Sequence, residues 1–362
     1  MMGFPPYGTT VPDLNPYQFN FNGLTFGGIS ADDTYPLASA GVTGLGLPKF
    51  VTGDVQRPLT SGELAGIDLS PGRDIIAQIV IVEDDAGDFD DALQALAAIM
   101  VPQGATETPL FFQTGGGTTF ACMARPRNFT YTRDFNVVEV NAAIVTMQFH
   151  ATDWRWYATP TQQVSGEQAQ VFATIVLGGT AYINPIIGVT AGDDGSTPVI
   201  LVWQGVAIVS IIGDGTTATV TTSTPHGLPG GDTSVIIVGN TESSFNIETA
   251  FTVTSPTTFT FPSSTMTTGT GGVVEIGTPI NIYFETLTMN PGDTLAVDTD
   301  SQTAVWVNDG TPQSAGSYIY FNPPTWGPLA PGVVYVVNLI DYADSDYSSV
   351  FTFTYAVAFA AI

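Results

Sequence analysis

Alternation of hydrophobic and polar positions recurs along the chain and predicts many short β-strands. Residues 17–23 alternate and end in an Asn-Gly turn signal, and residues 351–359 carry a large side chain at every second position. Residues 74–82 are apolar with little interruption, which indicates a strand that is covered on both faces. We therefore expect a mainly β protein in which residues 350–362 form a terminal strand that closes a sheet.

Only one segment has a convincing helical period. Residues 88–100 place Phe89, Leu93 and Leu96 on one stripe, and a proline two residues later ends the pattern. Acidic residues stand at the start of this segment, where carboxylates cap free backbone amides and meet the positive end of the helix dipole. The run of acids at residues 83–91 is therefore interpreted as a turn and a helix cap rather than a metal site.

The strand patterns divide the chain into three parts. An aromatic cluster at residues 150–157 precedes a polar stretch, which predicts a boundary near residue 162. Six short runs rich in Thr, Val and Ile follow, at residues 206–212, 217–222, 234–238, 251–254, 258–261 and 272–276. They suggest a small β-sandwich or barrel, placed as an insertion in a loop of a larger sandwich. The expected parts are a first domain of residues 1–162, a β-sandwich of residues 163–203 and 278–362, and an inserted small β-domain of residues 204–277.

Charge is distributed unevenly along the chain. Acids outnumber bases by 33 to 7, and all seven bases lie between Lys49 and Arg155, so residues 156–362 carry no lysine or arginine. Because proteins hold nucleic-acid phosphates with Lys and Arg, this distribution excludes specific nucleic-acid binding by the second half. The acidic excess has two interpretations: it keeps the protein soluble, or it forms a surface past which DNA slides without adhering.

Groups that carry catalysis are scarce. The only cysteine, Cys122, lies in a strand-like run and is expected to be a small buried side chain, so no intrachain disulfide forms. One of the two histidines, His226, stands among the prolines and glycines of a turn and is expected to be structural. The chain has no Gly-x-Ser-x-Gly elbow and a single lysine, which leaves no phosphate-binding loop. We expect neither an enzyme nor a cofactor.

The second half contains two groups with more than one interpretation. Trp306, Trp326 and Tyr335 could stack on a sugar, although large aromatic side chains more often fill a core or an interface. The acids of residues 341–346 offer oxygen ligands for Ca²⁺ but lack EF-hand spacing, so a solvated loop is preferred and no metal is expected. The apolar C-terminal run is too short to span a bilayer as a helix, and we expect no membrane insertion.

The order of several loose motifs resembles that of distal tail proteins of long-tailed, siphovirus-type bacteriophages. Features similar to the ring-forming N-terminal domain of that family are the strand at residues 17–23, the Gly72-Arg73-Asp74 sequence before an apolar strand, the acid-capped helix, and Arg125-Pro126-Arg127. Features similar to its C-terminal galectin-like sandwich are Asn184-Pro185, residues 289–298 and residues 326–332. Residues 204–277 are similar to small β-modules of many phage proteins, and the typical sandwich lacks this insertion.

The resemblance implies an N-terminal β-barrel or sandwich hub domain with one α-helix, followed by a galectin-like β-sandwich that carries the inserted domain. It implies a structural virion protein at the tail tip, forming a hexameric ring that joins the tail tube to the host-recognition tip and lets DNA pass. The implied partners are further copies of the chain, the tail-tube protein, tail-tip and fibre proteins, and a host cell-surface glycan. The family supplies no catalytic residue.

Within such a ring, Arg125, Arg127 and Arg133 are candidate inter-subunit contacts. A ring needs complementary surfaces that close by rotation, and these acidic subunits have few cations to offer one another. Two other functions stay open. One is a carbohydrate-binding adhesion module, and the other is a tail-tube subunit, which shares strands and a capped helix but normally lacks a two-part C-terminal half.

Overall fold

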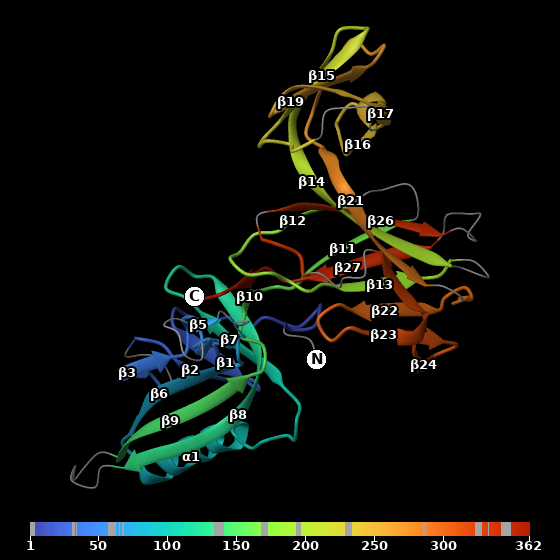
Figure 1. The fold of residues 1–362 in the computed structure, drawn as a ribbon. Coiled ribbons are helices and arrows are strands. Elements are labelled where there is room, and N and C mark those ends of the chain that lie inside the picture. Colours follow the sequence, from blue (N-terminus) through green and yellow to red (C-terminus); the bar gives the residue numbers. More distant parts are fainter. Residues whose placement is uncertain are drawn as a thin grey trace. The chain divides into compact units, whose positions relative to one another are not determined.

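The computed structural model describes residues 4–30, 33, 35–56, 63–64, 66, 69–133, 141–167, 173–192, 197–228, 234–284, 287–322, 328–331, 333–341 and 349–362. The chain forms two compact units (Figure 1). Unit 1 is Met1–Thr161 together with Ala356–Ile362, and unit 2 is Gln162–Tyr355. The division falls next to the expected limit near residue 162. The C-terminal segment, however, lies in unit 1 rather than in the second sandwich.

Unit 1 is built on a nine-stranded antiparallel sheet with the main order β2-β1-β7-β8-β9-β6-β3, in which β10 pairs with β8 and β28. Its strands are β1 (Gln18–Phe21), β2 (Leu24–Gly27), β3 (Leu37–Thr43), β6 (Arg73–Glu83), β7 (Thr108–Gln113), β8 (Thr119–Arg133), β9 (Asn141–Ala151), β10 (Trp156–Ala158) and β28 (Ala358–Phe359). A separate pair consists of β4 (Val55–Gln56) and β5 (Glu63–Leu64). Two backbone hydrogen bonds connect the segments next to the edge strands β2 and β3: Gly27 N donates to Tyr35 O over 2.8 Å, and Leu37 N donates to Gly28 O over 2.9 Å.

The single α-helix among the described residues, α1 (Ala86–Ile99), packs against β6 and β9. Phe89, Ala92 and Leu96 are buried in the core that the helix shares with the sheet. The helix begins two residues before the predicted start, and its cap is Asp85, whose carboxylate accepts from Gly87 N over 2.6 Å. The acidic run is thus a helix cap, as predicted, with an earlier acid in that role.

The middle of the sheet differs from the sequence prediction. Along β6 the side chains alternate strictly, with Ile75, Ala77, Ile79 and Ile81 in the core. The opposite face has no cover among the described residues, and Val82 there is 57% exposed. The prediction of a strand covered on both faces is therefore wrong for the single chain, because the helix covers one face only.

The C-terminal residues return to unit 1 after β27 (Val350–Tyr355) has ended in unit 2. In β28, Phe359 lies opposite Trp156 and Ala358 lies opposite Tyr157. The ring of Phe359 also meets the edge of Phe120, with the centroids 5.1 Å apart. The predicted single terminal strand is thus two short strands that belong to different units.

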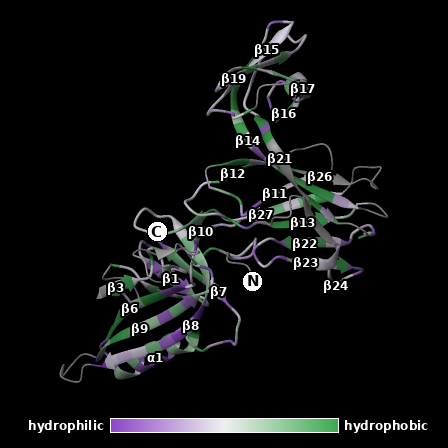
Figure 2. Cartoon of the chain, in the orientation of Figure 1, coloured by the Kyte–Doolittle hydropathy of each residue, from purple (hydrophilic) through white to green (hydrophobic). Residues whose placement is uncertain are grey.

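Unit 2 contains two antiparallel sheets. A six-stranded sheet has the order β11-β27-β13-β22-β23-β24, with β11 (Gln162–Glu167), β13 (Ile186–Thr190), β22 (Thr294–Asp298), β23 (Thr303–Asn308) and β24 (Thr311–Ser314). The other is eleven-stranded, and its part nearest the first sheet joins β12 (Ala173–Val176), β14 (Pro198–Gly213), β21 (Val273–Phe284), β25 (Ile319–Asn322) and β26 (Val334–Asp341). Hydrophobic residues dominate β13 and the first half of β14 (Figure 2).

The inserted segment extends this second sheet. Its strands are β15 (Thr217–Thr222), β16 (Ser234–Val238), β17 (Glu248–Ala250), β18 (Thr252–Ser255), β19 (Thr258–Pro262) and β20 (Thr268–Thr270), with a short 3-10 turn, η1 (Ser243–Phe245), before β17. Its own core includes Phe245, Phe259 and Phe261. Residues 204 and 277 fall inside β14 and β21, which run continuously from the sandwich into the insert (Figure 1). The pairing of β14 with β21 shifts register between Val202 and Gln204, next to the expected limits of the insert, so two strands with an irregularity at the junction join the insert to the sandwich.

The mainly β fold with one helix is confirmed for the described residues. The strands expected at residues 217–222, 234–238 and 258–261 are present with nearly the same limits. Strands β15 and β19 show why, because a buried side chain occupies every second position and threonine fills most of the others.

Candidate functional site

The arginines that were predicted to contact a neighbouring subunit all lie on β8, but their environments differ. The pairing of β8 with β9 shifts between Pro126 and Asn128, so Arg127 is the extra residue of a β-bulge. Its side chain is exposed and has no ion pair or hydrogen bond with a described residue. Arg127 is therefore available to another molecule.

Arg133, at the end of the same strand, is engaged within unit 1. Its Nη2 donates to Asn141 Oδ1 over 2.8 Å, and its guanidinium carbon lies 4.6 Å from the ring centroid of Phe89 on α1. Over the eight residues from Arg125 to Arg133 an extended strand covers about 26 Å, at roughly 3.3 Å per residue. The structure therefore does not gather the three arginines into one patch.

Arg125 begins a row of polar groups across three strands. His150 lies opposite Arg125 on one side and opposite Asp74 on the other. His150 Nδ1 is 2.8 Å from Asp74 Oδ1, and the half-buried Arg125 keeps its Nε without a hydrogen-bond partner among the described residues. The row combines both signs of charge at one end of the sheet.

The face of β6 and β9 that points away from the helix, here called the outer face, continues from this row. Its members alternate with the core residues and are Ile76, Gln78, Val80, Val82, Ala142, Ile144, Thr146 and Gln148. Val82 and Ile144 are 57% and 49% exposed, and no member is charged. An uncharged, partly apolar sheet face of this kind, with charge at one end, suits contact with another protein surface.

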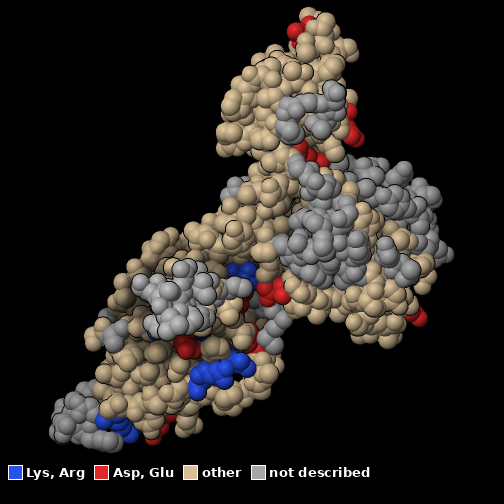
Figure 3. Space-filling model, in the orientation of Figure 1, with Lys and Arg blue, Asp and Glu red and all other residues tan. Residues whose placement is uncertain are grey.

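Figure 3 shows where charge lies on one side of the molecule. The blue lysines and arginines in this view belong to unit 1, in agreement with the absence of any base after Arg155. Two arginines of unit 1 are internal: Arg73 is 1% exposed, and Arg155 forms a 2.7 Å ion pair with Asp153. Burial lowers the pKa of Arg73 to about 10, so it stays charged at neutral pH. The basic groups near the surface are therefore fewer than the sequence count suggests.

The candidate sugar-contact residues do not form a platform. Trp306 is half-buried on β23 of the six-stranded sheet, whereas Tyr335 lies on β26 of the other sheet and is 3% exposed. The Tyr335 hydroxyl accepts from Ala330 N over 2.9 Å, which is typical of a packed tyrosine. Trp326 lies outside the described residues. A sugar contact at Trp306 stays a prediction.

Beside Trp306 two turns enclose a pocket of about 620 Å³, lined by residues 290–294 and 307–310. The buried Asp293 holds both turns in place. Its Oδ2 accepts from Asn290 N over 3.0 Å and from Trp306 Nε1 over 3.3 Å, and its Oδ1 accepts from Asp309 N over 3.2 Å. The pocket is preformed, and it presents polar groups without any cation.

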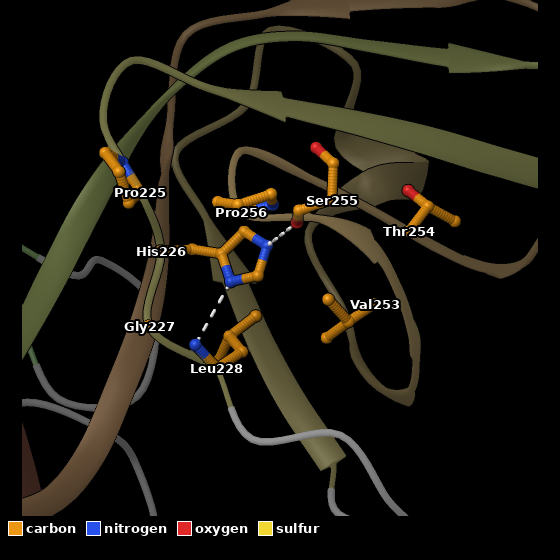
Figure 4. A pocket seen from close by; sticks show the side chains of 8 residues that line it. All are labelled: Pro225, His226, Gly227, Leu228, Val253, Thr254, Ser255 and Pro256. Carbon is orange, nitrogen blue, oxygen red and sulfur yellow. Dashed lines mark hydrogen bonds between the residues drawn. The ribbon is translucent and has the colours of Figure 1, made fainter.

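His226 is a structural residue, as predicted. It is 1% exposed, its Nε2 lies 3.0 Å from Ser255 O, and its Nδ1 accepts from Leu228 N over 3.1 Å (Figure 4). A pocket of about 380 Å³ opens beside it, lined mostly by apolar atoms of Pro225, Val253 and neighbouring residues. Because both ring nitrogens are already bound to backbone, the imidazole has no site left for acid–base work.

Other chemistry is sparse in the part of the chain that the structure describes. No three His, Cys, Asp or Glu side chains converge on a metal site there, and the predicted loop of residues 341–346 lies almost entirely outside that part. Cys122 is buried as predicted, and burial raises the pKa of its thiol well above the ordinary value. No described helix is both long and apolar enough to cross a membrane.

Sequence reasoning missed Asp293 and Glu275, two buried acids of unit 2. The turns that hold Asp293 lie within 16 residues of it, whereas the burial of Glu275 depends on pairing with the remote strand β14. Arg73 was singled out only as part of a motif, and its burial could not be read from that motif.

Comparison with known proteins supports the fold. The chain is similar to the Dit protein (gp 19.1) of phage SPP1, described as a paradigm of the hub adsorption apparatus in Gram-positive infecting phages. The TM-score is 0.50 at 12% identity, covering 94% of this chain and 98% of that one. Chains of the phage p2 baseplate in its activated conformation, with Sr and with Ca, match with TM-scores of 0.36 and 0.33 at 11% and 10% identity, covering 93% of this chain and 97% of those. No family model and no curated protein matches. The predicted likeness to distal tail proteins is therefore confirmed at the level of the fold.

Proposed function

We propose that the protein is a structural virion component that forms a ring at the distal end of a phage tail. In this role it joins the tail tube to the host-recognition tip and lets DNA pass through the ring. The observation that carries the proposal is the match in fold over 94% of this chain and 98% of a phage hub protein, which includes both units. A tail-tube subunit would not be expected to share the second unit.

The outer face of unit 1 supports self-association. It is uncharged and partly apolar, no described element covers it, and Arg127 stands exposed at the bulge of the neighbouring strand. A ring needs two different surfaces that meet in every repeat, and an apolar face with a nearby cation can meet an acidic neighbour in this way. We propose Arg127, and Arg125 with its unpartnered Nε, as inter-subunit groups, and we assign Arg133 mainly to the stability of unit 1.

The charge distribution supports the proposed division of roles. Residues 1–161 and 356–362 form the ring, residues 162–203 and 278–355 form the outward sandwich, and residues 204–277 form an added module. Because the second half has no base, any cation that holds subunits together must come from unit 1. An acidic lumen would let DNA slide through without adhesion, since no counterions would be released on contact. Tail-tube, tail-tip and fibre proteins are the proposed partners.

A structural rather than catalytic role is the simplest account of the site chemistry. Among the described residues, neither His150 nor His226 is hydrogen-bonded to a Ser, Thr or Cys side chain. A hydrolytic nucleophile needs such a base beside it. We infer no cofactor.

Negative-stain microscopy of the purified full chain tests the proposal. Six-fold rings with peripheral lobes are the expected result, and mass measurement in solution should give the matching copy number. A monomer over a wide range of protein and salt concentrations would contradict ring formation.

The pocket beside Trp306 favours a second candidate function, binding of a neutral sugar. Its polar rim without cations suits hydroxyl groups rather than phosphate or carboxylate. A glycan array with the full chain, with Trp306→Ala and with the surface control Tyr182→Ala distinguishes this function. Sugar binding is supported if the wild type and Tyr182→Ala give a signal that Trp306→Ala abolishes. If the protein forms rings but gives no signal on the array, the sugar-binding function is wrong and only the structural role stands.

A further inference from the structure

Glu275 on β21 is an isolated buried acid. Its side chain is 6% exposed, and neither carboxyl oxygen has a hydrogen-bond partner among the described residues. Burial of an ionised carboxylate without a partner is expensive, so native proteins rarely keep one without a reason. The surroundings of Glu275 therefore decide which form of the carboxyl the fold holds.

Strand pairing places Glu275 at the end of a ladder. It lies opposite Gly205 on β14, which has no side chain to cover it. On its other side, β16 pairs with β21 at only two positions, Ile237 with Val274 and Val238 with Val273. The next residue of β16 in the same register is Ile236, which would stand opposite Glu275, and the ladder stops there. The carboxyl thus marks the point where β16 leaves β21.

The only charged group that faces Glu275 among the described residues is another acid. Glu248 on β17 lies opposite Ile236, in the same row and on the same face, and Ser234 on β16 donates its hydroxyl to Glu248 over 2.8 Å. Residues 204–207 of β14 have no titratable side chain. On β26, Val334 packs on this face, so the alternation of a strand directs Tyr335 to the other.

No cation within unit 2 can neutralise Glu275. The unit contains no lysine or arginine, and both ring nitrogens of its single histidine, His226, are bound to backbone. Desolvation by burial, and secondarily the charge of Glu248, raise the pKa of Glu275 to about 8. The closed arrangement accordingly favours the protonated, neutral carboxyl at neutral pH.

We propose that Glu275 is a proton-dependent latch between β16 and β21. With the carboxyl protonated, the buried row stays neutral and β16 remains paired with β21. With the carboxyl ionised, the negative charge draws water and the ladder opens from this end. The latch lies where β14 and β21 enter the insert, so it couples solution pH to the attachment of the β16–β17 segment.

The direction of the pH effect follows from proton linkage. In the open form the carboxyl is hydrated, and its pKa returns to the ordinary value of 4.5, whereas the closed form has a pKa of about 8. The closed form is therefore fully favoured below the ordinary pKa and loses stability as pH rises towards the raised one. Between the pKa of the open form and that of the closed form, the equilibrium constant for opening increases by about tenfold per pH unit. Above the pKa of the closed form it no longer depends on pH.

Hydrogen exchange of the β16 amides, residues 234–238, tests the latch in the full chain. The wild type, Glu275→Gln and the surface control Asp309→Asn are compared at the same pH, so intrinsic exchange rates cancel. The control suits the site because Asn tolerates the positive φ of 46° at residue 309. Protection of β16 in the wild type and in the control should fall relative to Glu275→Gln by about tenfold per pH unit from about pH 5 to about pH 8, and then level off.

A uniform loss of stability in Glu275→Gln does not imitate this result, because the comparison uses the slope against pH. If that variant fails to fold, Glu248→Gln replaces it. Removal of the neighbouring charge should lower the pKa of Glu275 and move the level region to lower pH. The proposal is wrong if wild type and Glu275→Gln keep a constant ratio of protection across the range, or if Glu248→Gln leaves the profile unchanged.

Discussion

The Nη2 atom of Arg73 donates to the carbonyl oxygen of Ala360 over 2.8 Å, although 287 residues separate the two in sequence. The same guanidinium donates to the carbonyls of Trp154, Gly44 and Leu45 over 2.8 to 2.9 Å. One buried cation thus ties the end of the chain to the edge of the sheet in unit 1. The contact returns the C-terminal residues to unit 1 after the chain has completed unit 2.

Arg73→Met should lower the free energy of unfolding of unit 1 by about 3 to 5 kcal/mol, since four partly buried carbonyls lose a donor that is itself buried. Urea denaturation followed by tryptophan fluorescence measures the change. The matched control is Arg127→Met at an exposed position, which should stay within about 0.5 kcal/mol of the wild type. Equal effects of the two changes would contradict the anchoring role of Arg73.

If rings form, Arg127→Ser should weaken their assembly at low salt and reduce the dependence of assembly on salt. In the wild type, added salt screens the attraction between the exposed Arg127 and an acidic neighbour, and the variant lacks the charge that salt would screen. Arg133→Ser should instead lower thermal stability and leave assembly nearly intact, because its side chain bonds to Asn141 and covers Phe89. Sedimentation velocity at about 0.05 M and about 0.5 M salt makes the comparison. A third variant combines Arg125→Ser, Arg127→Ser and Arg133→Ser. If it assembles like the wild type at both salt concentrations, these arginines do not hold the subunits together by charge.

Asp293→Asn should destabilise unit 2 by about 2 kcal/mol, because an amide NH₂ group cannot accept from the donors that now meet the carboxylate. Thermal unfolding with and without the substitution gives the difference. Asp309→Asn changes a neighbouring exposed carboxylate and serves as the control. If the wild type binds a sugar on the glycan array, Asp293→Asn should lose that signal, because the turns that border the pocket are no longer held in place.

Asp85→Ala should cost about 1 kcal/mol, because the first turn of α1 loses the side chain that accepts from Gly87 N. Gln94→Ala on the exposed side of the same helix should be nearly neutral or slightly stabilising, since alanine favours helix. Denaturant unfolding of the two variants measures both changes. A neutral Asp85→Ala would show that packing of Phe89 and Leu96 alone sets the start of the helix.

The Cys122 thiol should not react with a thiol reagent in the native protein. The residue is buried in the core of unit 1, and burial raises the pKa of the thiol, which suppresses the reactive thiolate. Labelling should follow the unfolding of unit 1 and reach completion in denaturant. Rapid labelling of the native chain, with the fold intact by circular dichroism, would contradict the described core.

The sequence by itself determined the local elements of this protein. A period of two set the strands of the insert, and a period of 3.6 with acids at its start set the one helix, because each pattern depends on neighbours within a few residues. Composition alone showed that the second half has no cation, and the order of motifs indicated the fold that the comparison confirmed. The burial of Cys122 in a strand and the structural turn around His226 could likewise be predicted from adjacent residues.

Only the tertiary structure decided which distant segments meet. Local periodicity cannot show that β14 and β21 extend into the insert, that Trp306 and Tyr335 lie on different sheets, or that Arg127 alone of its group is exposed, at a bulge. The same limit applies to Arg73 and Glu275, two charged residues that the pairing of remote strands buries. Arg73 is surrounded by carbonyl groups, and among the described residues Glu275 faces a second acid, Glu248. That difference arises from long-range register rather than from the residues beside them.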